Sequence, residues 1–159
     1  MIEKLNYKNL YDVFEYLGRV EDNYFDFYIT LDKKRIFLRN NLYIINKILK
    51  TQEVYGLFDN ELNGLLLIYR EKGYRPYIKI LSKNKDSFLI KFLNWNFKDK
   101  DLYCKLKKEN ELCSLLRKCG FMKIGDRGKE VLLFRKGIKI LDKIIPKDNQ
   151  GENNDQYNK

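Results

Sequence analysis

The sequence predicts an α/β protein of the mixed α+β kind, in which about four helices flank a central, mostly antiparallel sheet of about six to seven strands. Apolar residues at helical spacing alternate along the chain with short apolar runs bounded by turn residues. The chain has 159 residues, 44% of them hydrophobic, which suffices for one domain with a sizeable core. We expect residues 1–146 to form this domain and the polar residues 147–159 to be a disordered tail.

The first third of the chain is predicted to form a short strand and two helices. Residues 2–6 read as the strand, and the first helix ends at Gly18, since glycine is a common left-handed helix stop. Its inward face consists of Leu10, Val13, Phe14 and Leu17. Residues 19–30 read as a loop, or as a strand around 25–29. A second, longer helix is predicted from the spacing of Leu38, Leu42, Ile45 and Leu49.

Three antiparallel strands and a third helix are predicted next. Residues 54–58 and 62–69 form a hairpin, and the second strand is apolar on both faces, which is typical of a central strand. A further strand is predicted at 77–81, preceded by Pro76, where the loss of one backbone donor is tolerated. The third helix covers about residues 85–97, and its inward face is predicted to be Phe88, Leu89, Phe92 and Trp95.

The stretch from 100 to 136 has the clearest order of elements. Residues 101–106 alternate as a strand, and a helix follows that Gly120 ends. The apolar face of this helix is Leu112, Leu115, Leu116 and Cys119. Two strands are predicted at 121–124 and 131–134, joined by a turn. Beyond them, an amphipathic segment is predicted to end at Pro146.

This order of elements, with the phrase Leu-Arg-Lys-Cys-Gly-Phe at 116–121, resembles the GCN5-related N-acetyltransferase (GNAT) family over about residues 1–136. In that family a strand, a helix and a Gly-Phe pair lead into the two final strands. The resemblance implies that the fourth strand splays from the fifth and that the gap admits the pantetheine arm of acetyl-CoA. It also implies an acyl-acceptor groove flanked by the first two helices.

The resemblance places the cofactor loop at residues 82–87. The family uses a glycine-rich loop there, whose backbone N–H groups and adjoining helix N-terminus hold pyrophosphate, but this loop contains no glycine. The candidate cofactor-binding residues are Ile80, Leu81, Ser82, Lys83, Asn84, Lys85 and Ser87. Backbone N–H groups at 80–82 would polarise the thioester carbonyl. The alternative is an ordinary helix cap by Ser82 or Asn84, with Asp86 near the helix start repelling a pyrophosphate.

The fourth helix departs from the family pattern in two places. The family often carries a tyrosine there as general acid for the thiolate, and the aligned residue is Leu116, which cannot donate a proton. The family also commonly has an asparagine near the start of this helix, and the aligned position here is Glu109. The next residue is Asn110, which we include among the cofactor-binding candidates. The catalytic candidates are Tyr77 and Tyr103, although tyrosines in such strands are usually core residues.

The composition excludes several classes of chemistry. The chain has no histidine, so mechanisms that need an imidazole base or ligand are excluded, including most zinc enzymes, and no metal is expected. Its cysteines, Cys104, Cys113 and Cys119, are odd in number and lack metal-like spacing, which is typical of reduced thiols in a cytoplasmic protein. The sequence contains no apolar run of about 18 residues, so no membrane span is predicted, and no secretory signal is expected.

Two hypotheses about function follow. The first is an acyl-CoA-dependent N-acyltransferase with acetyl-CoA as cofactor and an amine acceptor that the sequence does not identify. The net charge of +10 favours an acidic or nucleic-acid-linked acceptor, unless it reflects a lysine-rich composition alone. The alternative is a non-catalytic module of the same fold that binds nucleic acid or an acidic protein. The absent glycines and tyrosine favour it, as do the arginines and lysines among tyrosines at 69–77.

Overall fold

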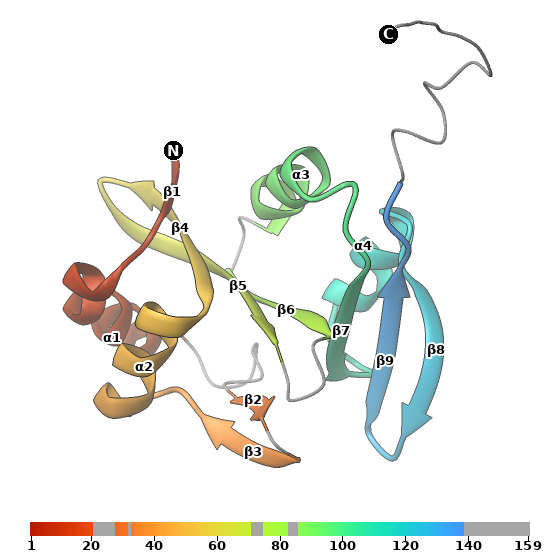
Figure 1. Cartoon of the computed structure of the whole chain (residues 1–159), viewed down its shortest axis with the longest axis horizontal. Helices are drawn as coiled ribbons and strands as arrows, with labels where there is room; N and C mark the ends of the chain where they lie inside the picture. Colours follow the sequence, from red (N-terminus) through yellow and green to blue (C-terminus); the bar gives the residue numbers. More distant parts are fainter. Residues whose placement is uncertain (21–27, 32, 71–74, 83–85, 139–159) are drawn as a thin grey trace, which may run out of the picture.

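The computed structural model describes residues 1–20, 28–31, 33–70, 75–82 and 86–138. A seven-stranded sheet runs through the molecule in the order β1-β4-β5-β6-β7-β9-β8 (Figure 1). Its strands are β1 (Ile2–Lys4), β4 (Glu53–Asp59), β5 (Glu61–Arg70), β6 (Pro76–Leu81), β7 (Leu102–Lys107), β8 (Met122–Arg127) and β9 (Glu130–Arg135). The remaining elements are the hairpin β2 (Tyr28–Leu31) and β3 (Lys34–Phe37), and helices α1 (Leu10–Arg19), α2 (Leu42–Thr51), α3 (Asp86–Asn96) and α4 (Leu112–Lys118). The predicted fold class is confirmed.

All neighbouring strands of the sheet pair antiparallel except β6 and β7, which run parallel. The parallel pair is connected through α3, since parallel strands need a crossover. The antiparallel run β4-β5-β6 is the one predicted from the sequence. At the turns, Asn60 and Gly120 adopt positive φ of 67° and 98°, so Gly120 does end α4 as expected.

The sheet separates two apolar cores. Helices α1 and α2 cover one face through residues such as Val13 and Ile45, which pack with Leu67 of β5. Helices α3 and α4 cover the other face, where Leu89 and Leu116 are fully buried. We call these the α1/α2 face and the α3/α4 face. Since successive strand residues point to opposite faces, each central strand supplies both cores.

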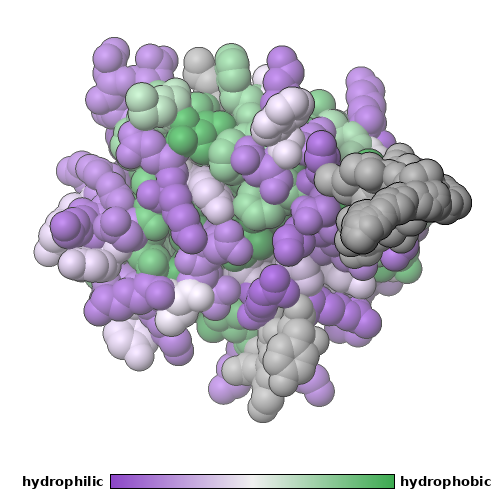
Figure 2. All heavy atoms as spheres, turned by 45° about the horizontal axis from the view of Figure 1, so that its top comes forward, coloured by the Kyte–Doolittle hydropathy of each residue, from purple (hydrophilic) through white to green (hydrophobic). Residues whose placement is uncertain are grey.

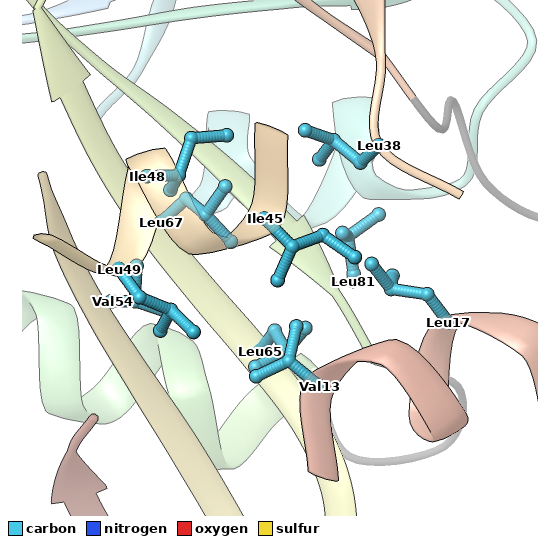
Figure 3. A pocket seen from close by; sticks show the side chains of 10 residues that line it. All are labelled: Val13, Leu17, Leu38, Ile45, Ile48, Leu49, Val54, Leu65, Leu67 and Leu81. Carbon is cyan, nitrogen blue, oxygen red and sulfur yellow. The ribbon is translucent and has the colours of Figure 1, made fainter. Parts of the chain in front are cut away.

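A small cavity lies within the core of the α1/α2 face (Figure 3). Its volume is about 20 Å³ and every lining side chain is apolar. Those side chains are Val13, Leu17, Leu38, Ile45, Ile48, Leu49, Val54, Leu65, Leu67 and Leu81. A cavity with no polar partner stays dry and gives a polar ligand nothing to bind, so we assign it to core packing.

Two helices differ from the sequence-based expectations. The second helix begins at Leu42, where Ile44 N–H donates to the Asn41 side chain at 3.2 Å, so the prediction that it includes Leu38 was wrong. Leu38 is buried for another reason, since it packs into the α1/α2 core from the segment after β3.

The prediction of the inward face of α3 was also partly wrong. Phe88 and Trp95 are 53% and 80% exposed, whereas Leu89, Ile90 and Leu93 are buried. The buried stripe is therefore offset from the aromatic one, because aliphatic side chains of α3 pack against the sheet. Gly18, expected to end the first helix, lies within α1, which extends to Arg19.

The surface agrees with the charged composition. On the side seen in Figure 2, hydrophilic residues cover most of the molecule and apolar residues show in smaller areas between them. Among the described residues no helix combines the length and apolar character that a bilayer crossing requires. Cys104 is buried, Cys113 and Cys119 are partly exposed, and these cysteines form no disulfide. Apart from Ile138, the predicted amphipathic segment and the tail 147–159 lie outside the described residues.

Candidate active site

The central feature of the sheet is an interrupted junction between β6 and β7. These strands pair at a single position, Tyr77 opposite Tyr103, whereas β5 and β6 pair at six positions. Toward their C-terminal ends the two strands do not pair, and a small cavity lies between them, which we call the gap. It is lined by Lys79, Ile80, Cys104, Lys105, Leu106, Asn110, Leu112 and Leu116.

The gap exposes one backbone edge of β6. This strand pairs with β5 through Leu81 on one side, but its pairing with β7 does not continue past Tyr77. Unpaired strand edges accept extended ligands, which add main-chain hydrogen bonds as a further strand would. The cavity there is about 10 Å³, barely enough to admit one water molecule, so an extended ligand has to part the lining side chains.

The catalytic candidates Tyr77 and Tyr103 come together at the closed end of the gap. Their ring centroids lie 5.5 Å apart, and Tyr77 is only 4% exposed. The aromatic row continues to Tyr69 on β5, 5.8 Å from Tyr77, and to Phe134 on β9, 4.9 Å from Tyr103. Both tyrosines therefore contribute to packing between four strands, and their role in catalysis stays a prediction.

Two of the cofactor-binding candidates, Ile80 and Asn110, line the gap. Asn110 also begins α4, because its Oδ1 accepts the N–H of Leu112 at 2.9 Å and its carbonyl accepts the N–H of Cys113 at 3.0 Å. Of the two positions considered for the family's asparagine, 109 and 110, it is Asn110 that borders the gap.

The other cofactor-binding candidates lie elsewhere or outside the described part of the chain. Leu81 is fully buried on the α1/α2 side, and its carbonyl lies 2.9 Å from the Tyr16 hydroxyl, which donates to it. Ser82 is also fully buried, facing Gly64 of β5, and Ser87 is exposed at the start of α3. Lys83, Asn84 and Lys85 lie outside the described residues.

Leu116 lines the gap and is fully buried. This is the position at which the resemblance expects the tyrosine general acid, so the gap offers no proton donor there. In the part of the chain that the structure describes, the cationic side chains at the gap are Lys79 and Lys105. Lys79 is 6% exposed with its Nζ 4.9 Å above the ring of Tyr28, and the Nζ of Lys105 lies 4.7 Å above the ring of Tyr77.

A second and much larger cavity, of about 470 Å³, adjoins the gap. We call it the hairpin cavity, because it lies between the hairpin β2–β3 and the strands β7, β8 and β9. Its lining residues are Thr30, Lys33, Arg35, Lys105, Gly125, Asp126, Arg127, Glu130, Val131 and Leu132. This cavity could not be predicted from the sequence, since its residues come from three separate segments. The one local signal was the basic run 33–35.

The hydroxyl of Ser82 allows a test of packing beside the gap. Its Oγ is buried without a hydrogen-bond partner among the described residues, and a Cβ on Gly64 would lie 2.8 Å from it. Ser82→Ala is expected to raise the free energy of unfolding by about 1 kcal/mol, because a buried unsatisfied hydroxyl is removed. Urea unfolding measures the change, with the exposed Ser87→Ala as the matched control. A loss of stability in Ser82→Ala would show that the hydroxyl has a partner.

No family model and no curated protein matches the sequence, whereas solved structures match most of the chain. A GNAT-family acetyltransferase from Streptococcus pneumoniae has 19% identity and a TM-score of 0.59, covering 85% of this chain and 98% of its own. An N-acetyltransferase from Staphylococcus aureus Mu50 has 18% identity and a TM-score of 0.58, with 86% and 96% covered. The dodecameric spermidine N-acetyltransferase from Vibrio cholerae has 12% identity and a TM-score of 0.58, with 91% and 98% covered.

The chain therefore has the fold of the GCN5-related N-acetyltransferases, and the resemblance seen in the sequence is confirmed at the level of the fold. The strand order and the parallel pair β6–β7, which pairs at a single position, agree with the arrangement that this resemblance implied.

Proposed function

We propose that this protein is an acyl-CoA-dependent N-acyltransferase that moves an acetyl group from acetyl-CoA to an amine. The observation that carries the proposal is the gap, where β6 offers an unpaired backbone edge beyond the single Tyr77–Tyr103 pairing. An extended, amide-containing arm such as pantetheine matches that edge, because it can exchange main-chain-like hydrogen bonds with it. The N-acetyltransferases of the same fold support this interpretation.

The residues at the gap fit an anionic thioester cofactor. Lys79 and Lys105 bring positive charge to its lining, and acetyl-CoA carries several phosphate charges. Asn110 uses its Oδ1 to cap α4, and among the described residues no hydrogen bond engages its Nδ2, which can therefore donate to a carbonyl in the gap.

Acetyl-CoA, when bound, supplies the thioester whose acetyl group is transferred. In this proposal, backbone N–H groups of β6 from Ile80 onward donate to the thioester carbonyl oxygen, and such donors stabilise the charge that develops there. An acceptor amine would have to enter neutral, and the proton that it loses would balance the charge on the departing sulfur. Leu116 has no proton to give, so the gap would not supply a general acid at that position.

Leu116 also favours a second candidate function, a non-catalytic module that binds nucleic acid or an acidic protein. A buried leucine in place of the general acid is what a chain that has kept the fold and lost the reaction would carry. Binding to an anionic polymer that weakens steeply with salt would support this candidate.

Thermal unfolding with excess acetyl-CoA, CoA or ADP tests the leading proposal. A ligand at about 100 times its Kd stabilises the folded state by about 2.7 kcal/mol, which raises Tm by roughly 5–10 °C in a domain of this size. We expect that shift with acetyl-CoA and a smaller one with ADP. No shift with acetyl-CoA would exclude it as cofactor and direct attention to nucleic-acid binding titrated against salt.

The variant Asn110→Asp locates the binding at the gap. It keeps an acceptor for the Leu112 N–H, so α4 stays capped, but it removes the amide donor and adds negative charge. We expect it to lose most of the acetyl-CoA shift. The matched control is Asn9→Asp, since Asn9 Oδ1 likewise accepts a backbone N–H, from Asn6 at 3.0 Å, and lies on the 3₁₀ turn before α1. Equal shifts in both variants would place the ligand away from the gap.

A further inference from the structure

We propose that the hairpin cavity is the acceptor site and that it takes a small amine which also carries an anionic group, a carboxylate or a phosphate. The proposal rests on the proposed function for the acetyl donor and adds the class of acceptor. It is argued from the walls of the cavity, its connection to the gap and its charge.

Contacts tie the hairpin to the sheet beside the cavity. The Lys79 Nζ on β6 lies 4.9 Å from the ring centroid of Tyr28 on β2, and within the hairpin the Arg35 guanidinium carbon lies 4.3 Å from the same centroid. Arg35 also reaches across to β9, where its Nη2 lies 3.7 Å from Glu130 Oε2. These contacts join the hairpin β2–β3 to β6 and β9, so side chains from the hairpin and from the sheet line the cavity together.

One residue lines both the hairpin cavity and the gap. Lys105 on β7 lines both spaces, so a molecule in the hairpin cavity lies beside the strand that borders the gap. The volume of about 470 Å³ lies within the range of small-molecule sites. A small acceptor can therefore occupy the hairpin cavity while a donor occupies the gap.

The charge of the lining favours an anion. Among the described residues of the lining, the cations are Lys33, Arg35, Lys105 and Arg127, against the carboxylates of Asp126 and Glu130. Asp126 is already paired, with its oxygens 2.5 Å from Lys108 Nζ and 3.0 Å from Lys123 Nζ. The hydrogen bond from Lys108, followed by that from Lys123, lowers the pKa of Asp126, so it stays ionised and matched to cations outside the lining. Glu130 is matched by Arg35.

The surplus of positive charge has two consequences for an acceptor. A carboxylate or phosphate gains charge-assisted hydrogen bonds from Lys33 or Arg127, both of which are exposed at the cavity. An amine held near Lys105 is more easily deprotonated, because a neighbouring cation disfavours the ammonium form. A polyamine meets like charge instead, so this cavity is unsuited to the acceptor named for the Vibrio cholerae protein.

Matched pairs of small amines test the inference. With acetyl-CoA as donor, we expect kcat/KM to be at least tenfold higher for phosphoethanolamine than for ethanolamine. We expect the same difference in kcat/KM between β-alanine and propylamine. Spermidine should be the poorest acceptor. The double variant Lys33→Glu/Arg127→Glu should abolish the preference for the anionic member of each pair, while Lys91→Glu, exposed on α3, should leave it unchanged.

Binding of phosphoethanolamine and of β-alanine, measured by thermal shift without acetyl-CoA, separates this inference from the proposed function. A shift with acetyl-CoA but none with either anionic amine would overturn the inference and leave the acyltransferase proposal standing. A shift of Tm with the anionic amines but none with acetyl-CoA would refute acetyl-CoA as the donor. If Lys33→Glu/Arg127→Glu also lost the shift with the amines, the anion site would be supported. A higher kcat/KM for spermidine than for the anionic amines, or binding of nucleic acid alone, would also overturn the inference about the acceptor.

Discussion

Replacing Leu116 by tyrosine is expected to raise kcat for acetyl transfer about a hundredfold. Leu116 lines the gap at the position where the related fold often carries a tyrosine acid, so the new hydroxyl can protonate the departing thiolate. General acids contribute roughly 10²–10⁴-fold, and we expect the lower end because Leu116 is fully buried and a larger ring has to be accommodated there. Release of free thiol from acetyl-CoA with phosphoethanolamine as acceptor measures the rate.

The control for this gain is Leu115→Tyr on the same helix. Leu115 is partly exposed and is not among the residues that line the gap, so its substitution should leave kcat unchanged. A new decline of the rate at alkaline pH, near the ordinary pKa of tyrosine at about 10, should accompany the gain only in Leu116→Tyr. A folded Leu116→Tyr protein with unchanged kcat would mean that protonation of the thiolate does not limit the rate, or that the chain has no transferase activity.

Replacing Arg135 by alanine is expected to lower the free energy of unfolding by about 3 kcal/mol. This side chain is 8% exposed and joins β9 to the end of α3. Its guanidinium donates to the side-chain carbonyl of Asn94 and, at 2.9 Å, to the carbonyl of Phe97. It also lies 5.3 Å above the ring of Phe121. Burial lowers the pKa of Arg135, which shows that these contacts hold a charge that is partly removed from water.

Urea unfolding followed by circular dichroism measures the loss. The matched control is Arg117→Ala, an exposed arginine in the last turn of α4, which should change stability by no more than about 0.5 kcal/mol. Arg135→Lys should fall between, because an ammonium cannot donate in two fixed directions. A change below about 1 kcal/mol in Arg135→Ala would show that the α3 contact contributes little.

Much of the fold could be predicted because its elements carry local signals. The helical spacing of apolar residues predicted α1 and α4, and the continuous apolar run at 62–69 predicted the central strand β5. The failures have a physical reason too. Helix α3 carries aromatic and aliphatic stripes side by side, and only tertiary packing decides that Leu89 and not Phe88 faces the sheet. The strand at 34–37 has a largely exposed, basic sequence and gives no strand signal.

The candidate site could be predicted only in part. The resemblance to the GNAT family led to Ile80 and Asn110, and both line the gap, although their binding of a cofactor stays a prediction. The hairpin cavity could not be found in this way, since Arg35, Lys105 and Glu130 are far apart in the chain and no spacing links them. Only the tertiary fold, which brings β3 over β7 and β9, gathers these charges. Fold-level likeness likewise does not choose an acceptor.

The single backbone pairing between β6 and β7 also bears on how the protein opens. Strands β1, β4, β5 and β6 form one continuous ladder, and β7, β9 and β8 form another. Cooperative unfolding units follow hydrogen-bonded ladders, so the junction at Tyr77 and Tyr103 is a natural boundary between two of them. Amide hydrogen exchange should then distinguish the two ladders in the empty protein. A molecule seated along the open edge would act as a missing strand and make them exchange as one unit.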